Sequence, residues 1–210
     1  MDAWESEDRT HYDACRDLGV LAEFCPPDAE LKSKKGKPAQ RQLKRERRAH
    51  NDKLIKKARL DVLIEKAAEL GAARLVPVLS EHTSVRDING ARAQALVIEA
   101  AEQCGRMTVP EVAPIASLSA VLDAWPAGRR LMFCDESGAG APMATALAAE
   151  APGSWAVLIG PEGGFSPAER AAIVARPFAI PVALGPRVLR ADTAAIAALT
   201  MLQAHLGDWR

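Results

Sequence analysis

The chain has 210 residues, and its 27 basic and 27 acidic side chains cancel to a formal net charge of zero at pH 7. Hydrophobic residues make up 49% of it, which is enough for a domain core, whereas aromatic residues make up only 4%. A balanced charge neither favours nor excludes nucleic acid as a partner. Because there is no apolar run of about 20 residues and no N-terminal apolar signal region, we expect no membrane span, no export signal and a cytoplasmic location.

The four cysteines, Cys15, Cys25, Cys104 and Cys134, are scattered along the chain. No pair has the spacing of a zinc motif and no histidine lies at a metal-ligand offset, so we expect no metal site. Scattered free thiols are typical of a reducing cytoplasm. We predict that Cys104 is a small core residue.

The charges are strongly segregated along the chain. Residues 1–30 carry nine acidic and two basic side chains, whereas residues 31–59 carry thirteen basic and two acidic ones. No lysine follows Lys66. This break predicts a domain boundary, with residues 1–53 forming an atypical segment that is disordered or aberrant. Its basic run is either an RNA-binding arm or a charged tail without a partner.

Regular elements are predicted from residue 54 onward. Apolar residues recur at helical spacing up to Leu70, and Gly71 is placed to end that helix as a C-terminal cap. Strands and helices then alternate, which predicts an α/β fold with a mainly parallel sheet and helices on both faces. In chain order we expect a strand at 74–79, a helix at 92–104, an extended piece at 108–112, a helix at 118–125, a strand at 131–134, a helix at 143–149, a strand at 155–159, a helix at 167–175, a strand at 180–184 and a final helix at 193–206.

Three polar or glycine-rich loops follow predicted strands, over residues 134–138, 160–164 and 185–193. Ligands of parallel sheets bind at the carboxyl ends of strands, so these loops are the candidate site. The sequence has neither G-x-G-x-x-G nor G-x-x-x-x-G-K-[ST], which disfavours a dinucleotide-dependent dehydrogenase or a P-loop enzyme. The loops suit a ligand held by backbone groups, such as a purine ring. The alternative is that their glycines only form turns.

Four ordered motifs lie in residues 54–210. They are Glu69–Gly71, Glu99–Arg106 with Val109-Pro110, Ile159–Gly164, and Leu184–Arg190 with Asp192-Thr193-Ala194. Together they resemble the RsmE family, the 16S ribosomal RNA (uridine-N3)-methyltransferases of the SPOUT superfamily. The resemblance implies a SPOUT-type, mainly parallel sheet with a deep trefoil knot near its C-terminus. It also implies a homodimer that uses S-adenosylmethionine to methylate 16S rRNA of the small ribosomal subunit, without a metal.

The resemblance also implies which residues hold the cofactor. Two segments would wrap its adenine and methionine parts, and the loop after the 131–134 strand would form a third wall. The implied residues are Phe133, Cys134, Asp135, Glu136, Leu158, Ile159, Gly160, Pro161, Glu162, Gly163, Gly164, Leu184, Gly185, Val188, Leu189, Arg190, Thr193 and Ala194.

Methylation at uridine N3 requires loss of the N3 proton, so a base or an anion-stabilising cation is needed. Arg190 is the candidate cation, and Asp192 and Glu162 are the candidate carboxylates. Arg106 and Arg187 are candidates for binding RNA. Two alternatives stay open, since the arginines also suit phosphate positioning without chemistry and Asp192 also suits capping of the final helix.

The sequence departs from the family in two places. The commonest family pattern has Arg-Thr-Glu-Thr where this chain has Arg190-Ala191-Asp192-Thr193, which shortens the carboxylate by one methylene. Residues 1–50 do not resemble the family's N-terminal PUA-like barrel, and one hypothesis is that they are translated out of frame. The alternative functions are methylation of another RNA base, or RNA binding by a catalytically impaired relic.

Overall fold

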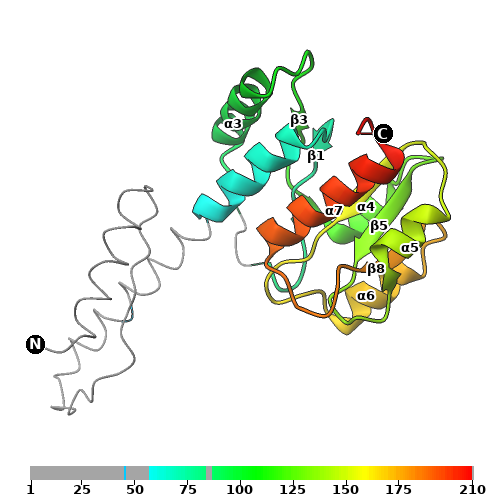
Figure 1. The fold of residues 1–210 in the computed structure, drawn as a ribbon. Helices are drawn as coiled ribbons and strands as arrows, with labels where there is room; N and C mark the ends of the chain where they lie inside the picture. The colour runs from blue at the N-terminus through cyan, green and yellow to red at the C-terminus, as the bar shows by residue number, and fades with distance from the viewer. Residues whose placement is uncertain (1–44, 46–56, 84–86, 210) are drawn as a thin grey trace, which may run out of the picture. The chain divides into compact units, whose positions relative to one another are not determined.

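The computed structural model describes Arg45, residues 57–83 and residues 87–209 (Figure 1). The chain divides into two units between Arg47 and Arg48, and all the helices and strands with bounds given below belong to the second unit. The predictions made for residues 1–53 lie outside the described residues, apart from Arg45, and the domain boundary at residues 53–54 stays a prediction.

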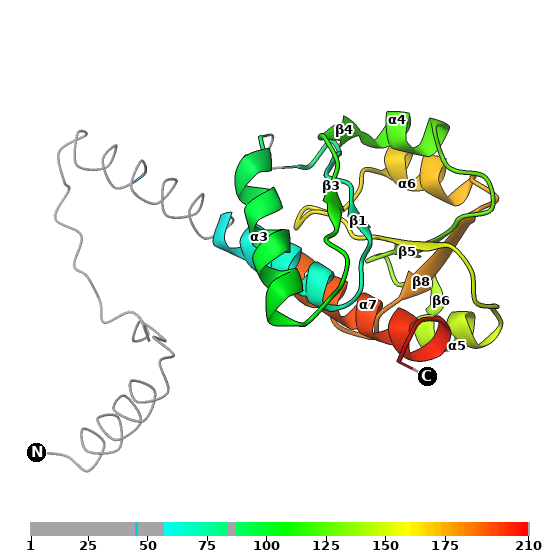
Figure 2. The same cartoon turned by 90° about the horizontal axis from the view of Figure 1, so that it is seen from above.

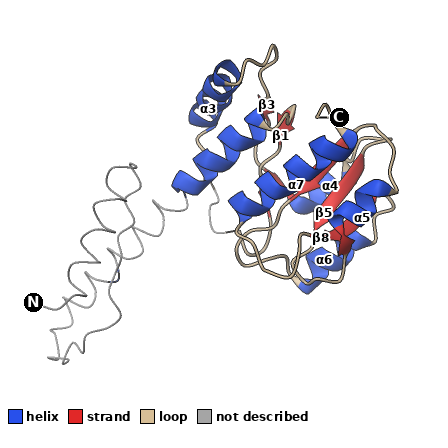
Figure 3. Ribbon diagram, viewed as in Figure 1, coloured by secondary structure: helices blue, strands red, loops and turns tan. Residues whose placement is uncertain are grey.

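A four-stranded sheet forms the centre of this unit (Figure 3). Its order is β6 (Ala141–Pro142), β8 (Ala179–Ala183), β5 (Arg130–Cys134) and β7 (Trp155–Leu158), and every pair is parallel. The four residues Leu131–Cys134 of β5 are all buried, as is typical of a parallel strand with neighbours on both sides. The predicted α/β fold with a mainly parallel sheet is therefore confirmed.

Helices cover both faces of this sheet (Figure 2). Successive side chains of a strand point to opposite faces, so Leu131 and Phe133 pack on the side of α4 and α6, whereas Met132 and Cys134 pack on the side of α5 and α7. Phe133 and Met132 are completely buried. The helices are α4 (Leu118–Asp123), α5 (Met143–Ala148), α6 (Pro167–Val174) and α7 (Ala191–Leu206).

A second apolar cluster lies between the first described helix, over residues 57–69, and α3 (Gly90–Gln103). Its buried members include Ile64, Ala68 and Val97. Gly71 has φ +88° directly after the 57–69 helix, as predicted for a C-terminal cap. Two short parallel strand pairs complete this part: β1 (Arg74–Leu75) with β3 (Glu111–Val112), and β2 (Val78–Leu79) with β4 (Ala116–Ser117).

The continuous strand predicted at 74–79 is wrong, because the chain forms β1 and β2 with a break at Val76-Pro77. Pro77 has no N–H to donate, and its carbonyl accepts from Ala116 N at the point where pairing passes from β3 to β4. Pro181 lies inside β8 without breaking it, because Ile180 and Val182 are the residues whose carbonyls and amides face β5. No helix among the described residues is long and apolar enough to cross a membrane.

Candidate functional site

Loops from three neighbouring strands lie at one edge of the central sheet. Because β8, β5 and β7 are adjacent and parallel, the segments after their carboxyl ends start side by side. Glu136, after β5, ties two of these segments together, since its Oε1 accepts a hydrogen bond from Phe165 N, after β7, at 3.1 Å. Asp135 N donates to Val182 O of β8 at 2.9 Å. The segments after β5 and β7 are thus in direct contact, and the idea that all three loops form one site stays a prediction.

Asp135 is the most buried acid of the site, with a side chain only 1% exposed. Arg170 of α6 binds it in a bidentate manner, with Nε at 3.0 Å and Nη2 at 2.7 Å from Oδ2. Burial alone would raise the pKa of the Asp135 carboxyl, but the hydrogen bonds from Arg170 and Ser137 and the charge of Arg170 outweigh it, so the pKa lies below its ordinary value. Asp135 is therefore an ionised anchor for the loop.

The loop after β7 has no room for a side chain at Gly164 and little room for one at Gly160. Gly164 has φ +67°, and a Cβ there would collide with Glu136 Oε1. A Cβ at Gly160 would lie 3.0 Å from the Phe165 ring. That ring meets Phe133 edge-on with centroids 5.5 Å apart, which fixes the loop onto the sheet. These contacts give the glycines a steric reason beyond simple turn formation.

A fourth segment, residues 80–83 after β2, also packs against this loop, and sequence reasoning missed it. His82 Nδ1 lies 3.0 Å from Gly163 O and 3.2 Å from Gly164 O, and between two carbonyls it acts as an N–H donor. Glu81 N donates to Glu169 Oε1 at 2.8 Å, while Glu169 also completes the capping box of α6 with Ser166. The one available signal was that His82 comes after a predicted strand, at the edge where the other loops lie.

The loop after β8 is the most exposed part of the site. Gly185 has φ +124°, and Val188, an implied cofactor residue, is 82% exposed. Arg190 is the N-cap residue of α7 but makes no side-chain capping bond. Asp192 lies in the first turn, where a negative charge is favoured by the helix dipole, and its Oδ1 accepts from Thr193 N at 2.9 Å. The alternative that Asp192 is the N-cap is therefore wrong.

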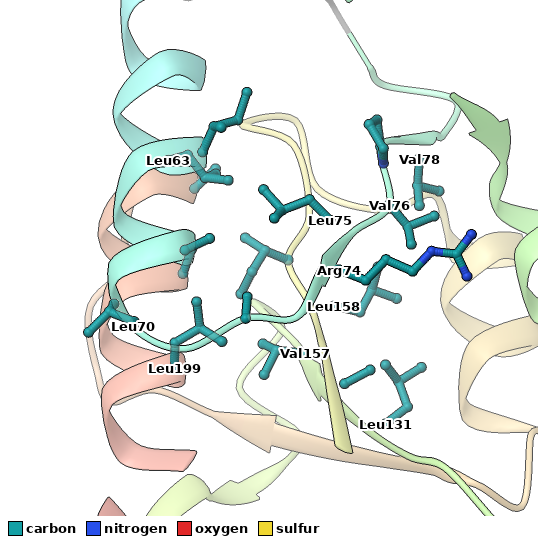
Figure 4. A pocket seen from close by; sticks show the side chains of 18 of the residues that line it. Leu63, Leu70, Arg74, Leu75, Val76, Val78, Leu131, Val157, Leu158 and Leu199 are labelled. Atoms are coloured by element: carbon teal, nitrogen blue, oxygen red, sulfur yellow. The ribbon is translucent and has the colours of Figure 1, made fainter. Parts of the chain in front are cut away.

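The implied cofactor residues are not all available through their side chains. Phe133 and Cys134 belong to the core on opposite faces of the sheet, so only their backbone atoms are left to contact a ligand. Burial raises the pKa of the Cys134 thiol to about 12, which keeps it neutral. Leu158, Ile159, Pro161, Glu162 and Asp192 line a cavity of about 640 Å³ that continues away from the loops (Figure 4).

Two predictions outside the loops have a different outcome. Arg106 Nη1 donates to Ala68 O at 2.5 Å and to Ala72 O at 2.9 Å, so it braces the end of the 57–69 helix, and a role in RNA binding stays a prediction. Cys104 is exposed, and its predicted place in the core is wrong. Within residues 57–83 and 87–209, no cluster of three His, Cys, Asp or Glu side chains could hold a metal ion.

Comparisons with known proteins agree with this arrangement. A family described as RNA methyltransferase domain matches residues 53–203. Ribosomal RNA small subunit methyltransferase E of Buchnera aphidicola is 33% identical over 165 residues, which cover 74% of this chain and 64% of the relative. The Synechocystis protein of the same name is 32% identical over 157 residues, covering 73% and 52%.

Solved structures give the same result. The methyltransferase E of Neisseria gonorrhoeae, bound to S-adenosylmethionine, has a TM-score of 0.64 and 34% identity over 73% of this chain and 63% of its own. A Legionella pneumophila protein, described as a methyltransferase in complex with the same cofactor, has a TM-score of 0.60 and 33% identity, covering 70% and 61%. The chain spans less than two thirds of the length of these relatives. Since the family match covers most of its residues, the chain belongs to the RNA methyltransferase domain family.

Proposed function

We propose that this protein transfers a methyl group from S-adenosylmethionine to N3 of a uridine in 16S rRNA of the small ribosomal subunit. The observation that carries the proposal is that β8, β5 and β7 are adjacent and parallel, so that the loops after them start at one edge, where Glu136 joins the segments after β5 and β7. The family match and the two cofactor-bound neighbours support it. A cytoplasmic location is part of the same proposal.

The residues at this edge fit the proposed cofactor. Glycines at 160 and 164 keep side chains out of this loop, which lets a ligand approach its backbone closely. Leu158, Ile159 and Leu184 offer apolar contact beside them. The two segments at 158–164 and 184–194 are proposed to cross as parts of a SPOUT-type trefoil knot. When bound, S-adenosylmethionine supplies an electrophilic methyl group.

Three side chains are proposed to act on the uridine. Arg190, exposed at the start of α7, would stabilise the negative charge that develops on the base as N3 loses its proton. Asp192 and Glu162 both line the cavity rim and are the two candidates to accept that proton. Asp192 already accepts a hydrogen bond from Thr193 N, which orients its carboxylate but leaves its second oxygen for substrate.

The remaining contacts concern partners. Arg187 is exposed on the same loop as Arg190 and is proposed to bind RNA phosphate. Arg106 is proposed for the same task only through the guanidinium nitrogens that the two carbonyls leave free. A homodimer is proposed with α7 at its interface, where Ile196 is 37% exposed. No metal is needed for this chemistry.

Cofactor titration and a methyl-transfer assay on small ribosomal subunits test the proposal. The chain should bind S-adenosylmethionine and yield 3-methyluridine, identified by mass spectrometry of digested 16S rRNA. Arg190→Ala should lower turnover about 100-fold while cofactor affinity and the far-UV spectrum are kept. The matched control is Arg129→Ala at the opposite end of β5, where the guanidinium donates to Ser154, and it should keep wild-type turnover.

A second candidate function is cofactor and RNA binding without efficient transfer. It is favoured by the fact that the chain matches less than two thirds of the length of its relatives, so the rest of their length has no counterpart in the matched region. Tight cofactor binding with no methylated nucleoside would establish this function. A methylated base other than 3-methyluridine would instead show that the protein is a methyltransferase with a different target base.

A further inference from the structure

Asp135 and Ser166 are the two buried polar residues in the part of the chain that the structure describes. Ser166 directly follows residues 160–165, which we call the glycine loop, and Asp135 directly precedes Glu136, which contacts that loop. Asp135 forms its ion pair with Arg170 of α6. Apolar side chains of the same volume often stabilise a fold as well as a buried ion pair does. The place of this pair beside the glycine loop therefore calls for a reason other than stability.

Asp135 closes the turn that contains Glu136. The Oδ1 atom of Asp135 accepts a hydrogen bond from Ser137 N at 3.1 Å, and its own N–H donates to Val182 O at 2.9 Å. A side-chain turn of this kind sets the backbone of the residue that it encloses, which is Glu136. Glu136 in turn accepts a hydrogen bond from Phe165 N in the glycine loop at 3.1 Å. The orientation of Glu136 therefore depends on the Asp135 carboxylate.

Arg170 holds the Asp135 carboxylate in this orientation. Its Nε lies 3.2 Å from Oδ1 and 3.0 Å from Oδ2, and its Nη2 lies 2.7 Å from Oδ2. One planar guanidinium thus engages both carboxylate oxygens, which the ammonium group of a lysine does less well. The pKa of Arg170 is raised by the hydrogen bonds and charge of Asp135 and further by the charge of Glu136. The same cation therefore balances two neighbouring carboxylates.

The helix end that carries Arg170 is itself attached to the site. Ser166 and Glu169 form a capping box at the start of α6, and Glu169 Oε1 also accepts a hydrogen bond from Glu81 N at 2.8 Å. The segments after β2 and β5 are thus both fixed to residues 166–170. A group on a braced helix is held more precisely than one on a loop.

We propose that Arg170 is a positioning residue of the cofactor site, which acts through Asp135 and Glu136 on the backbone of the glycine loop. The inference rests on the proposed function, in which that loop holds S-adenosylmethionine. Because residues 160, 163 and 164 are glycines, the loop has few side chains of its own with which to keep its shape. Loss of Arg170 should weaken cofactor binding and leave the methyl-transfer step unchanged.

Arg170→Met tests the inference, because methionine keeps an apolar stem but binds no carboxylate. Calorimetric titration should show a dissociation constant for S-adenosylmethionine that is raised at least about tenfold. Turnover at saturating cofactor should stay within about twofold of wild type, as expected when only binding is lost. Arg170→Lys keeps the charge but not the bidentate pair, so its affinity should be intermediate. If Arg170→Met does not fold, Arg170→Lys carries the same test with a smaller effect.

The matched control is Arg176→Met. Arg176 lies just after α6 and is 34% exposed, against 36% for Arg170, and it forms an ion pair with Asp123 at 2.5 Å. Asp123 differs from Asp135 because it is 65% exposed and ends α4, away from the glycine loop. The cofactor affinity of Arg176→Met should therefore stay within about twofold of wild type.

A second measurement does not need the cofactor. The amides of Ser137 and Phe165 donate to the carboxylates of Asp135 and Glu136, so their hydrogen exchange should become at least about tenfold faster in Arg170→Met. The amide of Ala120, which donates to the Ser117 hydroxyl at 3.2 Å, is the control and should exchange as in the wild type.

A double variant distinguishes positioning from a general loss of stability. Arg170→Met and Asp135→Asn remove the same contact, so together they should bind cofactor no more weakly than the weaker single variant. Wild-type affinity in Arg170→Met, an equal loss in Arg176→Met, unchanged exchange at Phe165 or additive losses in the double variant would overturn the inference. If the wild type bound no S-adenosylmethionine, the proposed function would fail, and exchange at Ser137 and Phe165 would still decide whether Arg170 positions the loop.

Discussion

The central sheet and the two short strand pairs are built from similar sequences but differ in continuity. Both contain apolar runs, Arg130–Cys134 in β5 and Arg74–Leu79 in β1 and β2. β5 has parallel neighbours on both sides and is buried over four residues. Among the described residues, β1 and β2 each pair on one side only, and their side chains are half-exposed. The difference shows that a strand's continuity is set by its neighbours as much as by its own residues.

The strongest test of this difference is to truncate one apolar side chain in each region and compare the loss of stability. Phe133→Ala should lower the free energy of unfolding by about 3–5 kcal/mol, because the side chain is completely buried and its removal leaves a cavity in the core. Leu75→Ala should cost only about 1–2 kcal/mol, because that side chain is half-buried and lines the cavity. Urea denaturation measures both. Equal losses would mean that the two regions are packed equally well.

The next effect concerns the ion pair of the central strand. Asp135→Asn should cost about 1–3 kcal/mol at pH 7, less than for a fully buried pair because Arg170 is 36% exposed. The pKa of Asp135 is lowered in the folded protein, so this stability is present above the carboxyl's unfolded pKa and is lost as the pH falls through its folded pKa. Denaturation curves at pH 7 and pH 3 should show the wild type and the variant converging at the lower pH. A constant gap would contradict the ion-pair explanation.

Much of this architecture could be predicted from sequence because the pattern is local. Alternating strands and helices placed the loops at 134–138, 160–164 and 185–193 at one edge, and the structure has them there. The prediction that Cys104 is a core residue was wrong for a local reason as well. This residue continues the buried stripe of Ala93, Val97 and Ala100, but α3 ends at Gln103, so the spacing no longer applies.

The rest depends on contacts between distant residues. His82 lies 81 residues from Gly163, and the two-residue strand β6 exists only because β8 lies beside it. Neither a period of 2.0 nor one of 3.6 can develop over two residues, so such strands leave no pattern to detect.

A smaller effect compares the two adjacent glycines of the site. Gly164→Ala forces a side chain into a left-handed conformation and against Glu136, at a cost of about 1–2 kcal/mol, and should displace the carboxylate from Phe165 N. Cofactor affinity should fall about tenfold. Gly163→Ala is the control, since its φ is not positive and its new methyl would only approach His82 Cβ at 3.0 Å. Calorimetric titration of both variants should rank Gly164→Ala as the weaker binder.

The smallest effect concerns a contact between the two regions. His82, which follows β2, contacts the carbonyls of Gly163 and Gly164 in the loop after β7. His82→Ala removes an N–H that serves two carbonyls, so the free energy that holds the loop in place should fall by about 1 kcal/mol. The cofactor dissociation constant should then rise about fivefold. Turnover at saturating cofactor should not change, because His82 positions the loop and contacts no reacting atom. His82→Gln, which keeps a donor, should restore most of the affinity. If the alanine variant lowered turnover at saturation instead, or the glutamine variant restored nothing, the hydrogen bond would not be the link between the two regions.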